Sequence, residues 1–475
     1  MMNELSVLHL AVTLTEPPSW VVLSIFSLVG LFVVFHRFWS LRNLDILLVL
    51  SFIPGFMLVY EGQQGSGIWL PGTAPETKLY WGFLSLLVCC GLMTVRMLWD
   101  TAIVRRPLLE PNLNSGGMLF IGISLILFLV INIAMSQPSP GDSNRASGLG
   151  PGNVLLRSIP RIETMQAPQA SDVDHSKSTS TAPGADVADA SSNEKSLPAP
   201  NNATLPAVAA KEVRRNLWIP KILAIASNLI LIASIVGIGY WHFGSFNTGV
   251  GTATLYLLLP YTAHTAGNVA HVVPGALLLL ALLMYRQPLL AGIFLGCAAG
   301  VVYYPFYLLP LWCSFYWQRG IQRFALGFAI SIVSLVIAMA LLYQNNFLQH
   351  LGYMFGIKQV EMQDLYGVWG LGWHPIARIP IIVVYIILSM SFVVWPAQKN
   401  LATLMSCSAG LLAAAQFWHG FGGGLFLAWF LPFAILTIFR PNLDYCVALE
   451  VVRPIRRKSP TAAKQPPSDP PMAAA

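Results

Sequence analysis

The sequence predicts an all-α fold: a polytopic bundle of transmembrane helices with about 11 to 13 membrane segments. Only 10% of the 475 residues are charged, against about 25% in soluble proteins, and the mean hydropathy is +0.64. Four stretches, 222–285, 287–318, 324–357 and 400–439, contain no Asp, Glu, Lys or Arg. Each is longer than the roughly 20 apolar residues that cross a bilayer. The composition therefore excludes a water-soluble fold for most of the chain.

The apolar segments follow one another along the chain. In the first third they lie at about 19–36, 45–60, 79–98 and 117–135. Later ones lie at about 219–241, 252–263, 272–285, 288–316, 324–343, 379–395, 400–418 and 425–439. Each ends at charges or at Pro- and Gly-containing stretches. Glu4 stands where a signal peptide has positive charge, so the first span is expected to be retained.

Composition divides the chain into four parts. Residues 1–135 form an N-terminal membrane part with four spans, and residues 218–440 form a C-terminal membrane part. Between them, residues 136–217 are rich in Ser, Ala, Pro and Asp, too polar to build a core, and are expected to be a disordered linker. Residues 441–475 form a tail that is basic at first and then rich in Pro and Ala.

The positions of Lys and Arg predict the topology, because short cytoplasmic loops are enriched in both. Arg37 and Arg42 place the first loop in the cytoplasm and the N-terminus outside. If 288–316 crossed once, Arg319 and the basic tail would be external. We therefore expect two short helices hinged around 303–305, which keeps both ends of the segment and the C-terminus cytoplasmic. The expected location is a bacterial inner membrane or an equivalent bilayer.

With this topology, chemically useful side chains gather on the external face. They are the carboxylates Glu61, Glu76, Glu361 and Asp364, the histidines His264, His271, His350, His374 and His419, and the cation Arg378. Carboxylates accept hydroxyl protons, Arg pairs with phosphate, and Trp and Tyr stack on sugars. Such a set suits a substrate with an apolar tail, a phosphate and a polyhydroxylated part.

Plainer interpretations stand beside this one. Interfacial aromatic residues occur in most membrane proteins, and loop carboxylates such as Glu361 and Asp364 are usually just solvated. The seven-residue spacing of His264 and His271 also fits one helix face with core histidines. The glycines after His419 suit a close backbone approach or a flexible rim, and equally a plain turn.

Residues 252–316 resemble the integral-membrane GT-C glycosyltransferases, in the mannosyltransferase-like branch that uses polyprenyl-phosphate sugars. A proline-ended helix, a Gly-Asn turn, a Leu-rich helix, an R-x-P-L-L-A-G phrase and an aromatic-Pro break follow one another as in that family. The matching residues are Pro260, Gly267, Asn268, Arg286, Pro288, Ala291, Gly292, Gly296, Ala298, Ala299, Tyr304, Pro305, Arg319 and Arg323. The stretch that ends in FLPFAILTIFRPNL is also similar to the last helices of these enzymes.

The resemblance implies an enzyme that transfers a sugar from a polyprenyl-phosphate donor to an acceptor on the extracytoplasmic face. The implied base is a carboxylate of the first external loop. Members commonly place Asp there, whereas this chain has Glu61, with Asp364 as a second candidate base. Arg378 would hold the lipid phosphate, and the expected substrate contacts are Glu361, His264, Asn268, His271, His374 and His419.

The bilayer and the lipid-linked sugar are the expected partners, and nucleic acid is not. No cofactor is required, no residue is assigned as a metal ligand, and a divalent metal is optional.

A second hypothesis comes from a different class: a non-enzymatic membrane protein, either a transporter of a neutral or lipidic solute or a scaffold. It predicts that deletion of residues 140–210 abolishes function, whereas a GT-C enzyme would keep its catalysis. A third alternative is a GT-C homologue that has lost activity. The sequence contains no Walker-type loop, GxSxG or HExxH motif, and it lacks the ladder of intramembrane charges typical of ion-driven carriers.

Overall fold

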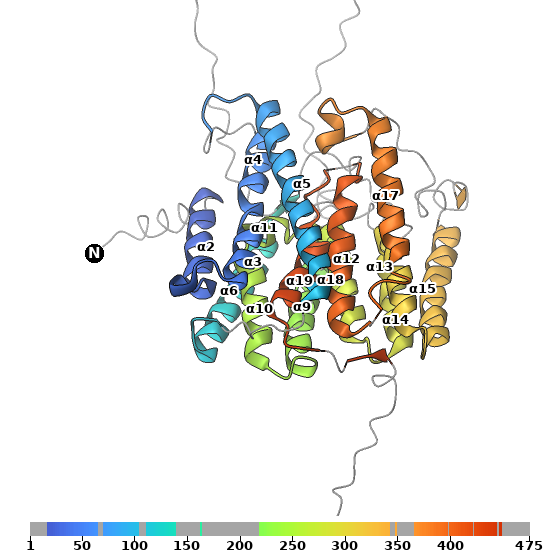
Figure 1. Cartoon of the computed structure of the whole chain (residues 1–475). Helices are drawn as coiled ribbons and strands as arrows, with labels where there is room; N and C mark the ends of the chain where they lie inside the picture. The colour runs from blue at the N-terminus through green and yellow to red at the C-terminus, as the bar shows by residue number, and fades with distance from the viewer. Residues whose placement is uncertain are drawn as a thin grey trace, which may run out of the picture.

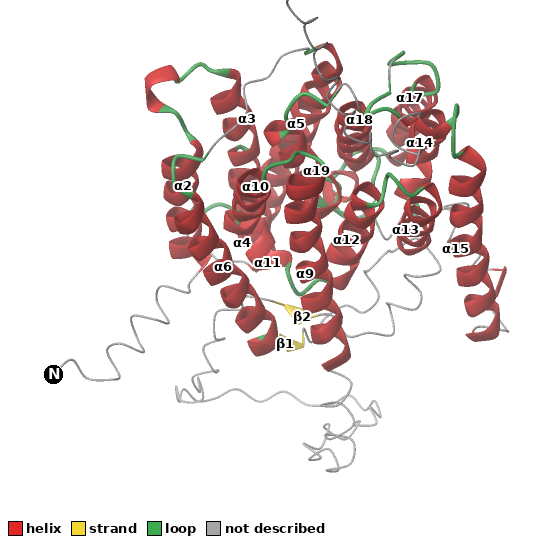
Figure 2. Cartoon of the chain, turned by 90° about the horizontal axis from the view of Figure 1, so that it is seen from below, coloured by secondary structure: helices red, strands yellow, loops and turns green. Residues whose placement is uncertain are grey.

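The computed structural model describes residues 17–64, 70–103, 111–138, 162–163, 218–342, 347–348, 365–397, 399–420, 422–443 and 446–448. These residues form a bundle of helices that pack side by side (Figure 1; Figure 2). The regular strands among them are the antiparallel pair β1 (Gln137–Pro138) and β2 (Ile162–Glu163). The all-α fold class is confirmed.

The helices of the N-terminal part are α2 (Pro17–Phe32), α3 (Leu41–Leu50), α4 (Phe52–Gln64), α5 (Pro75–Trp99) and α6 (Ser115–Met135), with the 3-10 turns η1 (Phe35–Arg37) and η2 (Asp100–Ala102). The C-terminal part begins with α9 (Trp218–Trp241), α10 (Phe246–Leu258), α11 (Pro260–Thr265), α12 (Val269–Leu283), α13 (Pro288–Val301), η3 (Tyr304–Leu308), α14 (Leu309–Tyr316) and α15 (Ile321–Leu342). It ends with η6 (Gly367–Gly370), η7 (Pro375–Ala377), α17 (Arg378–Ser391), α18 (Leu401–Ala414), η8 (Ala415–Phe417) and α19 (Leu427–Phe439).

The expected apolar segments all contain helices. In the described part of the chain, five helices are long and apolar enough to cross a membrane, and six shorter apolar helices accompany them. The total of eleven agrees with the predicted range. Two expected segments are split: 45–60 at Ser51, just before Pro54 in the first turn of α4, and 252–263 at Leu259, just before Pro260. Proline has no N–H to continue a preceding helix. Most of the predicted linker, and the tail beyond residue 448, lie outside the described residues.

The hinge in 288–316 is present. The helix α13 ends at Val301, a 3-10 turn follows, and α14 runs back to Tyr316. Its return is fixed by Tyr316, whose hydroxyl donates to the carbonyl oxygen of Tyr285 at 2.6 Å. The break falls at Val302, whose backbone is extended (φ −138°, ψ 131°), and Pro305, which has no N–H to continue α13, lies in the first turn of η3. The segment therefore begins and ends at the same end of the bundle, as the charge pattern predicted.

The hinged segment packs tightly on α15 through glycines. A Cβ atom on Gly292 of α13 would lie 2.1 Å from the carbonyl oxygen of Phe324, and one on Gly327 of α15 would lie 2.1 Å from that of Leu289. The two glycines therefore let the helix backbones touch. Small residues at such crossings are what membrane helices use for close packing.

We expect Gly327→Ala to lower the free energy of unfolding by about 1–3 kcal/mol, because the added methyl group forces the two backbones apart. The measurement is a thermal or denaturant unfolding curve in one detergent. Gly116→Ala in α6 is the matched control, since nothing lies within 4 Å of a Cβ built there. Equal losses in the two variants would contradict the packing argument.

The bundle has two chemically different ends. One end, here called the basic end, joins the last turns of α9 and α12, where His242 Nε2 lies 2.9 Å from the carbonyl oxygen of Leu283. It contains Arg42, Arg96, Arg286, Arg319 and Arg440. The opposite end, here called the hinge end, contains η3, the end of α4, the start of α5 and the start of α17. The ends of α4, α5 and α17 lie at the top of Figure 1. Which side of the membrane each end faces stays a prediction.

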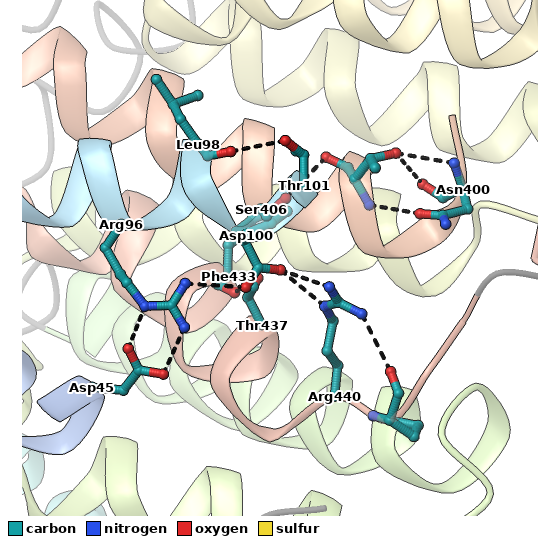
Figure 3. A network of polar contacts seen from close by, with 12 residues as sticks. Asp45, Arg96, Leu98, Asp100, Thr101, Asn400, Ser406, Phe433, Thr437 and Arg440 are labelled. Atoms are coloured by element: carbon teal, nitrogen blue, oxygen red, sulfur yellow. Dashed lines mark hydrogen bonds and ion pairs between the residues drawn. The ribbon is translucent and has the colours of Figure 1, made fainter. Parts of the chain in front are cut away.

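A buried ion network holds the basic end together (Figure 3). Arg96 pairs with Asp45 of α3 at 2.5 Å and with Asp100 at 3.2 Å, and Asp100 pairs with Arg440 at 2.7 Å. The side chain of Asp100 is 0% exposed. Among the described residues, two carboxylates thus face two guanidinium groups, and the network joins α3, α5 and the end of α19.

Exposed tryptophans mark both ends of the long helices. Trp218 and Trp241 are the first and last residues of α9 and are 61% and 60% exposed. In α5, Trp81 and Trp99 are 57% and 66% exposed. At 1.5 Å per residue the two pairs are about 35 and 27 Å apart along their helices, which brackets the roughly 30 Å hydrocarbon core between its aromatic belts. This spacing supports a bilayer around the bundle.

Candidate functional site

Glu61, the first candidate base, lies in the last turn of α4 and forms a buried ion pair. Its Oε1 accepts from Lys78 Nζ at 3.1 Å and from the backbone N–H of Leu70 at 3.4 Å. The side chains of Glu61 and Lys78 are 1% and 3% exposed. Each charge compensates the lost hydration of the other. Glu76 is exposed in the first turn of α5, so the two loop carboxylates have different surroundings.

His264 lies directly beside the helix that carries Glu61. Its ring contacts Tyr60 and Phe56 of α4 edge-on, with centroids 4.3 and 5.4 Å apart. Tyr60 precedes Glu61 in the chain, so α11 is packed against the turn that holds the carboxylate. The neighbouring Asn268 is the N-cap residue of α12, and its side chain makes no cap hydrogen bond.

His271 lies on α12 and His264 on α11, so the two do not share one helix face; that interpretation is wrong because the chain turns at 266–268. The Nδ1 atom of His271 lies 3.1 Å from the hydroxyl of Tyr261, which also accepts from the backbone N–H of Ala428 at 3.1 Å. The His271 ring packs on Phe426 with a centroid distance of 4.4 Å. These contacts join α11, α12 and α19.

His419 is 1% exposed and lies among aromatic rings. It stacks on Tyr304 at 5.0 Å and packs on Phe426 at 4.3 Å. His271 and His419 thus share Phe426 as a neighbour. The glycines after His419 permit close approach: a Cβ atom on Gly423 would lie 2.1 Å from the carbonyl oxygen of Gln416. The backbone supports two of the interpretations of these glycines: the close approach, and a turn at 422–424, where Gly422 and Gly424 adopt positive φ.

Arg378 is the first residue of α17, and its guanidinium group is held in place. Nε and Nη2 donate to the carbonyl oxygen of Trp418 at 3.2 and 2.8 Å. The group also lies over the ring of Trp369, 5.9 Å from its centroid. Because two of its nitrogen atoms are held in place, the guanidinium group is preorganised to bind an anion through its remaining N–H groups.

The hinge places an aromatic group next to Arg378. We call it the hinge cluster; it consists of Tyr303, Tyr304, Tyr307, Tyr385, Trp418 and Trp429. Trp418 is its centre, with ring centroids 4.9 Å from Tyr304 and 5.6 Å from both Tyr303 and Tyr385. Tyr304 reaches on to Trp429 at 5.6 Å. Sequence reasoning named the hinge but missed Trp418 and Trp429, whose only signal was their place on either side of the glycine run.

A hydrogen bond connects the helix that carries Glu61 with Tyr366, which in turn contacts the loop beside Arg378. Gln63, two residues after Glu61, donates its Nε2 hydrogen to the hydroxyl of Tyr366 at 2.5 Å. Tyr366 in turn exchanges backbone hydrogen bonds with Gly420 and Gly422, each of 3.0 Å. Contacts thus run from the last turn of α4, through Tyr366 and residues 418–420, to Arg378. The structure brings Glu61, His264, Asn268, His271, His419 and Arg378 to the hinge end.

Other candidates do not join this group. His374 is exposed, and its Nδ1 accepts from the backbone N–H of Ile376 at 3.4 Å. Glu361, Asp364 and His350 lie outside the described residues, so their predicted roles stay predictions. Among the residues that are described, no group of three or more His, Cys, Asp or Glu side chains could hold a metal ion.

Comparisons with protein-family models, with curated proteins and with solved structures gave no match to this chain.

Proposed function

We propose that this protein is an integral-membrane glycosyltransferase that transfers a sugar from a polyprenyl-phosphate donor to an acceptor hydroxyl at the hinge end. The observation that carries the proposal is the gathering of a buried carboxylate, histidines, a preorganised Arg378 and the hinge cluster at one end of a bundle with apolar outer faces. The resemblance of residues 252–316 to GT-C enzymes adds the reaction type.

The roles follow from the chemistry of the side chains. Arg378 binds the donor phosphate, because guanidinium pairs with phosphate oxygens, and the aromatic rings pack against the sugar. Glu61 takes the proton of the acceptor hydroxyl as the acceptor oxygen bonds to the anomeric carbon. The bond between that carbon and the phosphate oxygen breaks, and its electron pair leaves with the polyprenyl phosphate.

Glycan analysis in the source cells tests this proposal. Cells that lack the chain are complemented with the wild type, Arg378→Gln or Arg319→Gln, and their lipid-linked and surface glycans are compared. We expect Arg378→Gln to reduce one glycan at least tenfold. Arg319, exposed at the basic end, is the matched control and should restore wild-type levels. An unchanged glycan profile in cells that lack the chain would reject sugar transfer.

A further inference from the structure

The hinge cluster contains polar atoms that its own rings leave without partners. Tyr385 Oη, Trp418 Nε1 and Trp429 Nε1 are buried and have no hydrogen-bond partner among the described residues. Their side chains are 3%, 5% and 3% exposed. Trp312 Nε1 and Trp369 Nε1 do find acceptors, at 3.2 and 3.1 Å, whereas Trp20 Nε1, in α2, has none among the described residues. Buried donors in native proteins are normally satisfied by protein, water or ligand.

One of the three atoms belongs to Trp418, which contacts Arg378, and a second belongs to Tyr385, whose ring packs on that of Trp418. Trp418 supplies the carbonyl oxygen that fixes the guanidinium group, 2.8 Å from Nη2. Tyr385 lies on the same helix as Arg378, α17, and its ring is 5.6 Å from that of Trp418. Trp429 lies beyond Tyr304. An indole N–H and a guanidinium group can only donate, so the missing partner must offer acceptor atoms.

The positive charge of Arg378 further restricts the chemistry of the ligand. In the described part of the chain, none of the ion pairs involves Arg378. Its positive charge is half-buried beside aromatic rings, and such a charge is costly without an anion. A phosphate supplies both missing elements, because it carries negative charge and several acceptor oxygens close together.

We propose that the indole N–H of Trp418 and the hydroxyl of Tyr385 bind, together with Arg378, the phosphate of a polyprenyl phosphate. The inference rests on the proposed function for the kind of lipid. It adds two neutral donors that decide how tightly the headgroup is held. Because both donors lack a partner among the described residues, their loss breaks no hydrogen bond of the empty protein and costs the complex two hydrogen bonds.

The test measures binding by calorimetry on the full chain in detergent, with three probes: farnesyl phosphate, farnesol and inorganic phosphate. The variants are Tyr385→Phe, which keeps the ring and removes only the hydroxyl, and Trp418→Phe, which removes the indole N–H together with part of the ring. Trp312→Phe is the matched control, because it loses the same part of a buried indole. We expect Tyr385→Phe to melt at the wild-type temperature, Trp418→Phe and Tyr385→Phe to bind farnesyl phosphate at least tenfold more weakly, and Trp312→Phe to bind it as the wild type does.

Each probe decides one point. Farnesyl phosphate that binds more tightly than inorganic phosphate identifies a lipid headgroup, and the reverse order identifies free phosphate, against the lipid part of the proposal. Farnesol binding as tight as farnesyl phosphate, or equal affinities in Trp418→Phe, Tyr385→Phe and the wild type, would overturn the site. Phosphate binding that depends on Trp418 in a chain whose loss leaves glycans unchanged would keep the site and reject sugar transfer. Altered glycans in cells that lack the chain, together with phosphate binding that does not depend on Trp418, would support sugar transfer and reject the site.

Discussion

Asp100→Asn is expected to lower the free energy of unfolding by about 3–5 kcal/mol, the usual effect of removing one partner from a buried ion pair. Asp100 faces both Arg96 and Arg440 and is fully buried. Without its charge, the guanidinium groups of Arg96 and Arg440 lose the carboxylate that both of them contact. Unfolding in mixed micelles, followed by circular dichroism, measures the change.

The matched variant is Asp100→Asn with Arg440→Gln, which removes one charge of each sign. It should recover most of the lost stability, because Arg96 keeps its two bonds to Asp45, at 2.5 and 2.8 Å. If Asp100→Asn alone were as stable as the wild type, the network would not hold the basic end together.

Glu61→Gln is expected to destabilise the protein by a similar amount, about 3–5 kcal/mol, since it removes the charge of the buried carboxylate that pairs with Lys78. The second variant, Glu61→Gln with Lys78→Met, removes both charges and should restore near wild-type stability. Exchanging a buried ion pair for neutral groups of similar size is often tolerated. Glu76→Gln, an exposed carboxylate near the same loop, controls for surface charge.

A double variant no more stable than Glu61→Gln would show that the pair is not the source of the effect. The outcome also matters for function, because it provides a folded chain that lacks the candidate base.

The positions of the helices could be predicted from the sequence, because hydropathy and the placement of Lys and Arg are properties of whole segments. The hinge followed from Arg286 and Arg319 alone, since both had to share one side. That inference needed no knowledge of side-chain packing. The structure confirms it through the contact between Tyr316 and Tyr285.

The local composition of the hinge end was harder to foresee. Lys78 was known only as a loop cation, because its pairing with Glu61 depends on how α4 and α5 pack. The sequence did not distinguish Trp418 from the other tryptophans, because its contacts with Tyr304 and Tyr385 depend on how η3 and α17 pack against it. Contacts between distant segments leave no mark in local sequence patterns.

Sugar transfer with Glu61 as the base is the central claim, and the folded double variant tests it most directly. Cells that lack the chain are complemented with the wild type, Glu76→Gln, or Glu61→Gln with Lys78→Met, at equal amounts of folded protein, and their lipid-linked and surface glycans are measured. The proposal predicts that the wild type and Glu76→Gln restore the missing glycan and that the double variant restores less than about a hundredth of it. A double variant that restores the full amount would contradict the claim.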